Sequence, residues 1–174
     1  GLRVPTKHDG MATFPGPDGL TYIIRNHEVD SENPSRGAFG KKNELLALVD
    51  RARIYDTGVG DNPAMGGTTT LVFDTRTQSL RKHFLSLAGT VHNCAGGPTP
   101  WGTWLSCEET TVTTGDRYLR PHGYVFEVRP SSDVGLAEPK PILGMGRFKH
   151  EAIAVDPSSG CVFLTEDLVD GLIY

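Results

Sequence analysis

The chain has 174 residues, and its 17 Lys and Arg residues against 21 Asp and Glu residues give a formal net charge of −4 with histidine neutral. This acidic balance argues against nucleic acid as a partner, because surfaces that bind it carry an excess of Lys and Arg. With 37% hydrophobic and 22% charged residues, the composition is that of a globular protein and excludes general disorder. No run of about 18 apolar residues occurs, so we expect no membrane span.

Turn-forming residues are frequent and cysteines are few. The 21 glycines and 12 prolines predict many tight turns. Cys94, Cys107 and Cys161 are an odd number, so at least one of them stays out of any internal disulfide. A disulfide between Cys94 and Cys107 across a hairpin is possible and would leave Cys161 unpaired. Three cysteines in 174 residues are too few for a scaffold stabilised by disulfides.

Short runs with β-type alternation, bounded by turn residues, favour an all-β fold. Three hairpins are predicted, each with two short strands around a turn rich in Gly, Pro or Ser. In chain order, they join residues 10–14 to 20–28, residues 93–100 to 101–109, and residues 151–156 to 161–167.

Each predicted hairpin ends in a polar triplet that carries at least one acid. The triplets are Asn26-His27-Glu28, Cys107-Glu108-Glu109 and Thr165-Glu166-Asp167. This recurrence indicates an internal repeat. The intervals between the triplets exceed the roughly 40 to 50 residues of one propeller blade, so insertions are expected.

Further strand candidates extend two of the hairpins into four-stranded units. Residues 68–74 and 80–87 complete the first unit, and residues 123–128 and 141–144 complete the second. About two and a half such units fit part of a β-propeller. Because the chain stops in the apolar run 171–174, we expect residues 1–174 to be an incomplete propeller domain whose later blades are missing.

One stretch departs from the β pattern. Residues 43–54 carry apolar residues on one helical face after a possible Asn43 cap, which predicts an inserted helix. Alternating apolar positions leave an extended segment as the alternative. Residues 30–37 and 110–122 are predicted to be surface loops.

The acids at the hairpin ends are the most informative residues for function. Glutamates that follow strands in successive blades can converge on one axis, and close carboxylates repel unless cations or protons neutralise them. Calcium is the usual cation for oxygen ligands. The alternative is that each strand-end acid simply faces water.

Two further segments contain possible ligands. Cys94 lies among small residues and could bind a metal as a thiolate, although a lone cysteine in a strand is more often a buried apolar residue. Glu151 begins the third hairpin next to His150, which places a carboxylate at the start of a blade or forms a surface pair. The motifs of P-loops, serine hydrolases and zincins are absent from the sequence.

Several of these segments together resemble the PhoX-type alkaline phosphatases. They are residues 26–28, 66–70, 93–109, 150–152 and 165–168, and the resemblance extends over nearly the whole chain. It implies an exported, six-bladed propeller that hydrolyses phosphomonoesters with iron and calcium held by carboxylates and one thiolate. We therefore expect a monomer in the periplasm or secreted, with any export signal upstream of Gly1.

The resemblance also implies roles for single residues. Cys94 and Glu151 would be the catalytic ligands of iron. Glu28, Glu108 and Glu109 would lie on the calcium side, with the choice between Glu108 and Glu109 left open. Asn26 and Asp167 are additional candidate ligands, and without the acids and the arginine of later blades we expect the isolated chain to be inactive. Phosphoryl transfer would then be metal-assisted, without a protein nucleophile.

Two other functions remain compatible with the sequence. A propeller whose calcium ions only stabilise it could be a binding or scaffold module, which predicts calcium without iron. A different calcium-dependent propeller hydrolase, such as a lactonase or a phytase-like enzyme, would bind calcium and have no use for Cys94.

Overall fold

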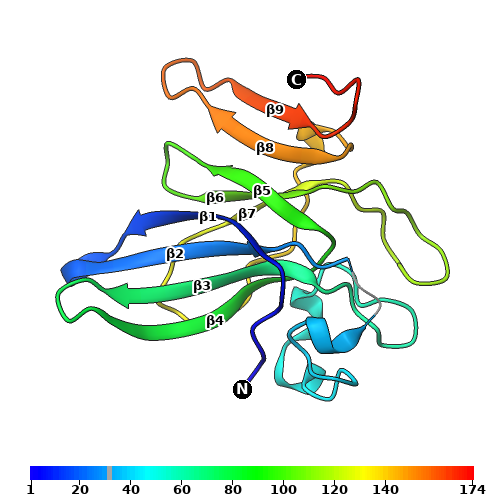
Figure 1. The fold of residues 1–174 in the computed structure, drawn as a ribbon, viewed down its shortest axis with the longest axis horizontal. Helices are drawn as coiled ribbons and strands as arrows, with labels where there is room; N and C mark the ends of the chain where they lie inside the picture. Colours follow the sequence, from blue (N-terminus) through cyan, green and yellow to red (C-terminus); the bar gives the residue numbers. More distant parts are fainter. Residues whose placement is uncertain (31–32) are drawn as a thin grey trace.

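The computed structural model describes residues 1–30 and 33–174 of the chain. In these residues all regular structure consists of antiparallel strands and short 3-10 helices, which confirms the all-β prediction. Three separate sheets of four, three and two strands follow one another along the chain (Figure 1). No helix of the described part is long and apolar enough to cross a membrane.

The first sheet has the strand order β1-β2-β3-β4 and confirms the first predicted four-stranded unit. The turn between β1 and β2 is a 3-10 helix at Pro17–Gly19, where proline presets φ and Gly19 adopts a positive φ of 79°. The strands are β1 (His8–Pro15), β2 (Leu20–His27), β3 (Gly66–Asp74) and β4 (Ser79–Thr90).

The second and third sheets contain the other two predicted hairpins. Their strands are β5 (Asn93–Pro98), β6 (Trp104–Glu108) and β7 (Val125–Val128), followed by β8 (His150–Val155) and β9 (Val162–Glu166). The predicted strand at residues 141–144 is wrong. A single bridge joins Pro141 to Phe126, because proline has no amide hydrogen for a ladder, and Leu143–Met145 then forms a 3-10 helix.

The predicted helix at residues 43–54 is also wrong. Asn43 has a φ of 56°, which is left-handed and does not suit an N-cap. The segment instead forms two 3-10 helices, Leu46–Leu48 and Arg51–Arg53, separated by extended backbone at Val49. Leu46 packs with Phe39 and Leu85, so tertiary packing outweighs helix propensity here.

The two predicted loops have different outcomes. Residues 110–122 form no strand or helix, as expected. The 30–37 segment includes residues 31 and 32, which lie outside the described residues, and ends in a 3-10 helix at Pro34–Arg36. Asn33 begins this helix by accepting a hydrogen bond from the Ser35 amide.

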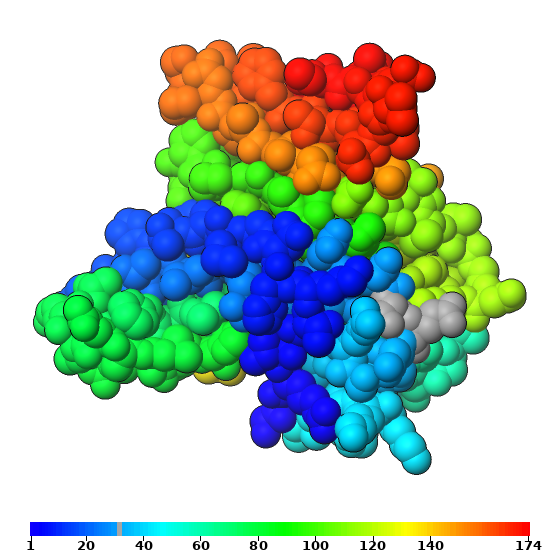
Figure 2. Space-filling model, in the orientation of Figure 1, coloured from blue at the N-terminus to red at the C-terminus, as the bar shows by residue number. Residues whose placement is uncertain are grey.

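The segments of the chain follow one another across the molecule in sequence order (Figure 2). Buried apolar clusters join the first sheet to the second and the second to the third. Strand β6 contributes to both interfaces, because successive residues of a strand point to opposite faces. Trp104 packs with Ile24 in the cluster between the first and second sheets. Leu105 and Cys107 pack with Ile153 in the cluster between the second and third sheets.

The first strands of the three sheets, β1, β5 and β8, lie side by side (Figure 1). Glycines permit this close approach. A Cβ at Gly10 would lie 2.9 Å from the carbonyl oxygen of Cys94, and a Cβ at Gly97 would lie 2.0 Å from that of Ile153. Any side chain at Gly97 would therefore push β5 away from β8.

The buried amide of Asn26 links the first sheet to the second. Its Nδ2 donates to the carbonyl oxygens of Cys94 at 3.1 Å and Ala95 at 2.7 Å. Its Oδ1 accepts from Trp104 Nε1 and Ser106 Oγ, both at 2.9 Å. One side chain on β2 thus satisfies polar groups on both β5 and β6.

A buried triad of charged residues holds the end of β6. His122 Nδ1 lies 2.7 Å from Glu108 Oε1, and its Nε2 lies 3.1 Å from Asp56 Oδ2, with all three side chains inaccessible to solvent. Burial alone would lower the pKa of His122, but the hydrogen bonds to Asp56 and Glu108 raise it to about 9. An imidazolium between two carboxylates therefore links the loop at residues 110–122 to the second sheet.

We expect Asn26→Ala to lower the free energy of unfolding by about 2–4 kcal/mol, because three buried polar groups and one partly buried group lose their hydrogen-bond partner. Urea denaturation followed by the fluorescence of buried Trp104 measures this change. The control is Asn62→Ala, which removes one amide contact with Asn43 and should cost at most about 1 kcal/mol. Equal effects of the two substitutions would contradict the role given to Asn26.

The His122 triad predicts a loss of stability in alkali. Because the pKa of His122 is raised in the folded state, its contribution is complete below the unfolded value of 6.5 and is lost as pH rises through about 9. The free energy of unfolding should fall over this range by no more than about 3 kcal/mol. NMR titration of the His122 ring should give a midpoint near 9.

His83 is the matched control, because burial lowers the pKa of this partly buried imidazole. Its midpoint should lie below that of His122. A His122 midpoint at or below the ordinary value of 6.5 would exclude the charged triad.

Candidate metal centre

Potential metal ligands from all three sheets come together at one end of the strands. Each lies in or directly beside a strand whose place in the sheets is fixed by backbone pairing. We call this set the inter-sheet cluster; it comprises Glu28 after β2, His92 before β5, Cys94 in β5, Glu109 after β6 and Glu151 in β8.

Cys94, Glu109 and Glu151 form one group of the cluster. The sulfur atom and one carboxylate oxygen of each glutamate lie within 4.8 Å of one another. A single ion spans such separations with ligand distances of about 2.0–2.6 Å. Cys94 is buried and the two glutamates are partly exposed, so the group is open on one side.

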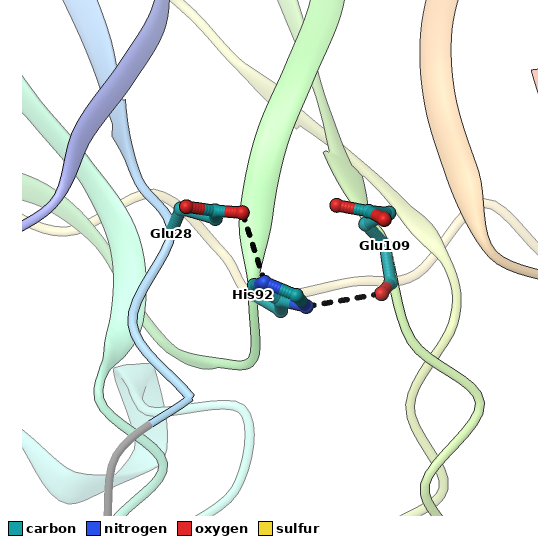
Figure 3. Close-up of side chains that lie close together, drawn as sticks. All are labelled: Glu28, His92 and Glu109. Carbon is teal, nitrogen blue, oxygen red and sulfur yellow. Dashed lines mark hydrogen bonds and ion pairs between the residues drawn. The ribbon is translucent and has the colours of Figure 1, made fainter. Parts of the chain in front are cut away.

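Glu28, His92 and Glu109 form the second group, and their ligand atoms also lie within 4.8 Å of one another. His92 Nε2 lies 2.9 Å from Glu28 Oε1, while His92 Nδ1 lies 3.1 Å from the backbone oxygen of Glu109 (Figure 3). Glu109 belongs to both groups, so the two candidate sites share one carboxylate.

The local backbone explains how His92 reaches this position. His92 lies in the tight turn between β4 and β5 with a left-handed φ of 55°. Its amide donates to the Val29 carbonyl oxygen at 3.2 Å, and its own carbonyl oxygen accepts from the Glu109 amide at 2.9 Å. The turn is therefore bonded to the ends of both β2 and β6.

The electrostatics of the cluster favour a cation. Burial and a hydrogen bond with Asp167 raise the pKa of Glu109. Burial also raises the pKa of the Cys94 thiol, and the carboxylates of Glu151 and Glu109 add to that rise. The site as built thus disfavours further negative charge, and a bound cation would relieve this repulsion. The one neighbouring ammonium, among the described residues, is Lys149 at 3.8 Å from Glu109 Oε1.

Glu108 and Asn26, two of the expected ligands, lie outside this cluster. Glu108 Oε1 accepts from the Val91 amide and His122, and its Oε2 accepts from the amides of Gly123 and Tyr124. The carboxylate of Glu109 lies instead near those of Glu28 and Glu151, as expected when successive strand residues point to opposite faces. Asn26 uses both amide atoms in its contacts with β5 and β6.

Asp167 and Glu28, the remaining expected ligands, border the cluster from different sheets. Asp167 follows β9, is exposed, and forms a hydrogen bond with Glu109. Glu28 follows β2 and pairs with His92. The acids at the ends of three hairpins therefore do converge in space.

His92 is a member of the cluster that the sequence analysis missed. Its signal is its position, directly before the Asn93-Cys94 start of a hairpin whose second strand, β6, is followed directly by Glu109. Asp56 and His122 were also missed, and their pairing spans 66 residues without any local motif.

The three cysteines are free thiols, so the possible disulfide between Cys94 and Cys107 is not formed. Cys107 faces the apolar cluster between the second and third sheets. Cys161 is exposed at the turn between β8 and β9. Cys94 is thus the one thiol that lies against the carboxylates of the described cluster.

Comparison with known proteins adds one match. A family model described as "Alkaline phosphatase PhoX" matches residues 63–174. This region contains Cys94, Glu109, Glu151 and Asp167, whereas Glu28 and Asn26 precede it. No curated protein and no solved structure matches the chain.

Proposed function

The chain belongs to the alkaline phosphatase PhoX family, and we propose that its inter-sheet cluster binds iron and calcium for the hydrolysis of phosphomonoesters. One observation carries the proposal. Within the region matched by the family model, the thiol of Cys94 and the carboxylates of Glu109 and Glu151 lie within 4.8 Å of one another. Such a mixed sulfur and oxygen donor set suits a transition metal such as iron.

The donor chemistry divides the cluster between the two metals. Cys94 and Glu151 would hold iron, because thiolates favour transition metals over calcium. Glu109 would serve as a shared carboxylate, and Asp167 would add an oxygen on the calcium side. Glu108 and Asn26 are assigned to holding the strands, since their polar atoms are already bonded within the chain.

The metals, when bound, would polarise the phosphoryl oxygens and make water a nucleophile at moderate pH. The chain's own residues prepare the site for this chemistry. Glu109 and Glu151 hold negative charge at fixed positions, and Cys94 must give up its thiol proton to bind as a thiolate. No protein nucleophile is needed in this scheme.

The proposed architecture is a β-propeller, with the three sheets as about two and a half consecutive blades of six. The side-by-side arrangement of β1, β5 and β8 supports it, because innermost strands of successive blades are neighbours around a common axis. The carboxylates after β2 and β6 would then face that axis. Export to the periplasm or the medium, and a monomeric state, belong to the same proposal.

Elemental analysis of the purified full-length protein, together with hydrolysis of p-nitrophenyl phosphate, tests this function. We expect iron and calcium in the wild type. Cys94→Ala should lose iron and reduce activity by at least about 100-fold, because a direct ligand is removed. Glu151→Gln should have the same direction of effect on both readouts.

Cys161→Ser is the matched control, since Cys161 is an exposed free thiol away from the cluster. It should keep both metals and full activity. Calcium without iron in the wild type, or normal activity in Cys94→Ala, would overturn the proposal. The first result would instead favour a calcium-only scaffold or a calcium-dependent hydrolase of another kind.

A further inference from the structure

We propose that a cavity between the first and second sheets binds a small neutral saccharide, with the Thr70 hydroxyl as a hydrogen-bonding partner and the Trp101 ring as a stacking surface at its border. We call it the β4–β7 cavity; its volume is about 790 Å³. This volume lies within the roughly 300–1,000 Å³ of small-molecule sites. The inference is independent of the proposed phosphatase function, because the cavity shares no residue with the inter-sheet cluster.

Three parts of the chain form the walls of the β4–β7 cavity. They are β3 and β4 of the first sheet, β7 of the second sheet, and the segment 129–143 that follows β7. This segment is bonded to both sheets, because the Ala137 amide donates to the Ser86 carbonyl oxygen at 2.7 Å and the Ile142 amide donates to that of Val125 at 2.9 Å. The cavity is therefore formed before a ligand binds, which lowers the cost of ordering it.

The hydroxyl of Thr70 carries the first step of the argument. Thr70 lines the cavity and is fully buried, and its Oγ1 has no hydrogen-bond partner within the described part of the chain. A buried hydroxyl without a partner is costly, so the native protein is expected to provide one. Because Thr70 borders the cavity, a molecule bound there can supply that partner.

The side chain of Trp101 carries the second step. Trp101 is 59% exposed in the turn between β5 and β6. Its Nε1 donates to Glu127 Oε1 at 2.8 Å, and Glu127 lines the cavity, so the indole is held at the cavity border. An exposed aromatic face in a fixed place suits the face of a sugar ring that carries C–H groups.

The carboxylate of Glu127 supplies an acceptor for sugar hydroxyls. Its Oε1 accepts from Trp101 and, at 2.6 Å, from Thr103 Oγ1. The hydrogen bond from Thr103 lowers the pKa of Glu127, and the one from Trp101 adds to this effect, so the group is a carboxylate at neutral pH. Both bonds use Oε1, which leaves Oε2 for a ligand as far as the described residues are concerned.

The charges of the cavity lining select a neutral ligand. Acids outnumber bases by three to two; the acids are Glu127, Asp133 and Glu138, and the bases are Arg129 and Lys140. This balance disfavours an anion. A purely apolar ligand would leave the Thr70 hydroxyl unpaired. A saccharide has hydroxyls that both donate and accept and an apolar face as well, so it suits Thr70, Glu127 and Trp101 together.

Saturation-transfer NMR and tryptophan fluorescence of the purified full-length protein test the inference. The probes are maltose, lactose, cellobiose and N-acetylglucosamine at up to about 10 mM, a range that covers weak binding. We expect at least one probe to receive saturation and to change the tryptophan emission. That change should be absent in Trp101→Ala, because Trp104 is buried. No saturation transfer to any of these probes would overturn the inference.

Two substitutions locate the binding site. Trp101→Ala should weaken binding at least about tenfold, since the stacking surface is lost. Thr70→Val keeps the shape of the side chain and should weaken binding about fivefold, since one hydrogen bond is lost. Without sugar, its melting temperature should equal or exceed that of the wild type, because the unpaired hydroxyl is gone. Unchanged affinity in Thr70→Val would mean that water alone satisfies this hydroxyl and would overturn the assignment.

The matched controls are Phe163→Ala, an exposed aromatic residue on β9, and Thr13→Val, an exposed threonine on β1. Both should keep the wild-type affinity. A loss of affinity in either control equal to that of Trp101→Ala would place the sugar elsewhere and contradict the inference. Phosphatase activity and metal content report on the other proposal, and Trp101→Ala should leave both unchanged.

Discussion

The side chain of Asn26 is the contact on which the geometry of the site depends. Its amide forms hydrogen bonds with two carbonyl oxygens of β5 and with two donors of β6. The Asn26 side chain is fully buried. A buried polar group without a partner destabilises the fold by more than a single hydrogen bond stabilises it. The first and second sheets are therefore held at the one spacing that lets all of these bonds form. The Cys94 backbone is held directly, and the Cys94 thiol in turn contacts the backbone oxygens of His150 and Glu151. A chain of polar contacts thus runs from β2 to β8.

Two adjacent glutamates at the end of β6 have different surroundings. Glu108 is buried against a protonated His122 and three backbone amides, so its charge is compensated within the chain. Glu109, one residue later, faces the opposite side, where Cys94 and Glu151 are its neighbours. Its charge has little compensation there, as its raised pKa indicates. The same residue type thus meets opposite environments at successive positions, because a strand alternates its faces.

Local patterns predicted the hairpins well, since strand alternation and turn residues act over a few positions. They also predicted that acids after β2, β6 and β9 would converge. They failed at residues 43–54, where a left-handed Asn43 and packing of Leu46 break the helix. The different surroundings of Glu108 and Glu109 could not be predicted, because they depend on the pairing of β6 and on contacts with distant segments. His92 and the Asp56–His122 pair depend on contacts between distant segments, for which the sequence has no local signal.

The close packing of β1, β5 and β8 through Gly10 and Gly97 has an evolutionary consequence. Cys94 and Glu151 of the cluster lie in β5 and β8, two of the strands at this contact, and Glu28 and Glu109 follow the next strands, β2 and β6. Strands β3, β7 and β9 contribute none of the five side chains. The second sheet already tolerates a single bridge at Pro141 in place of a full fourth strand. Insertions and deletions can therefore accumulate at the periphery while the candidate ligands keep their spacing. Selection should act most strongly on Gly10 and Gly97, the two residues at this contact that have no side chain.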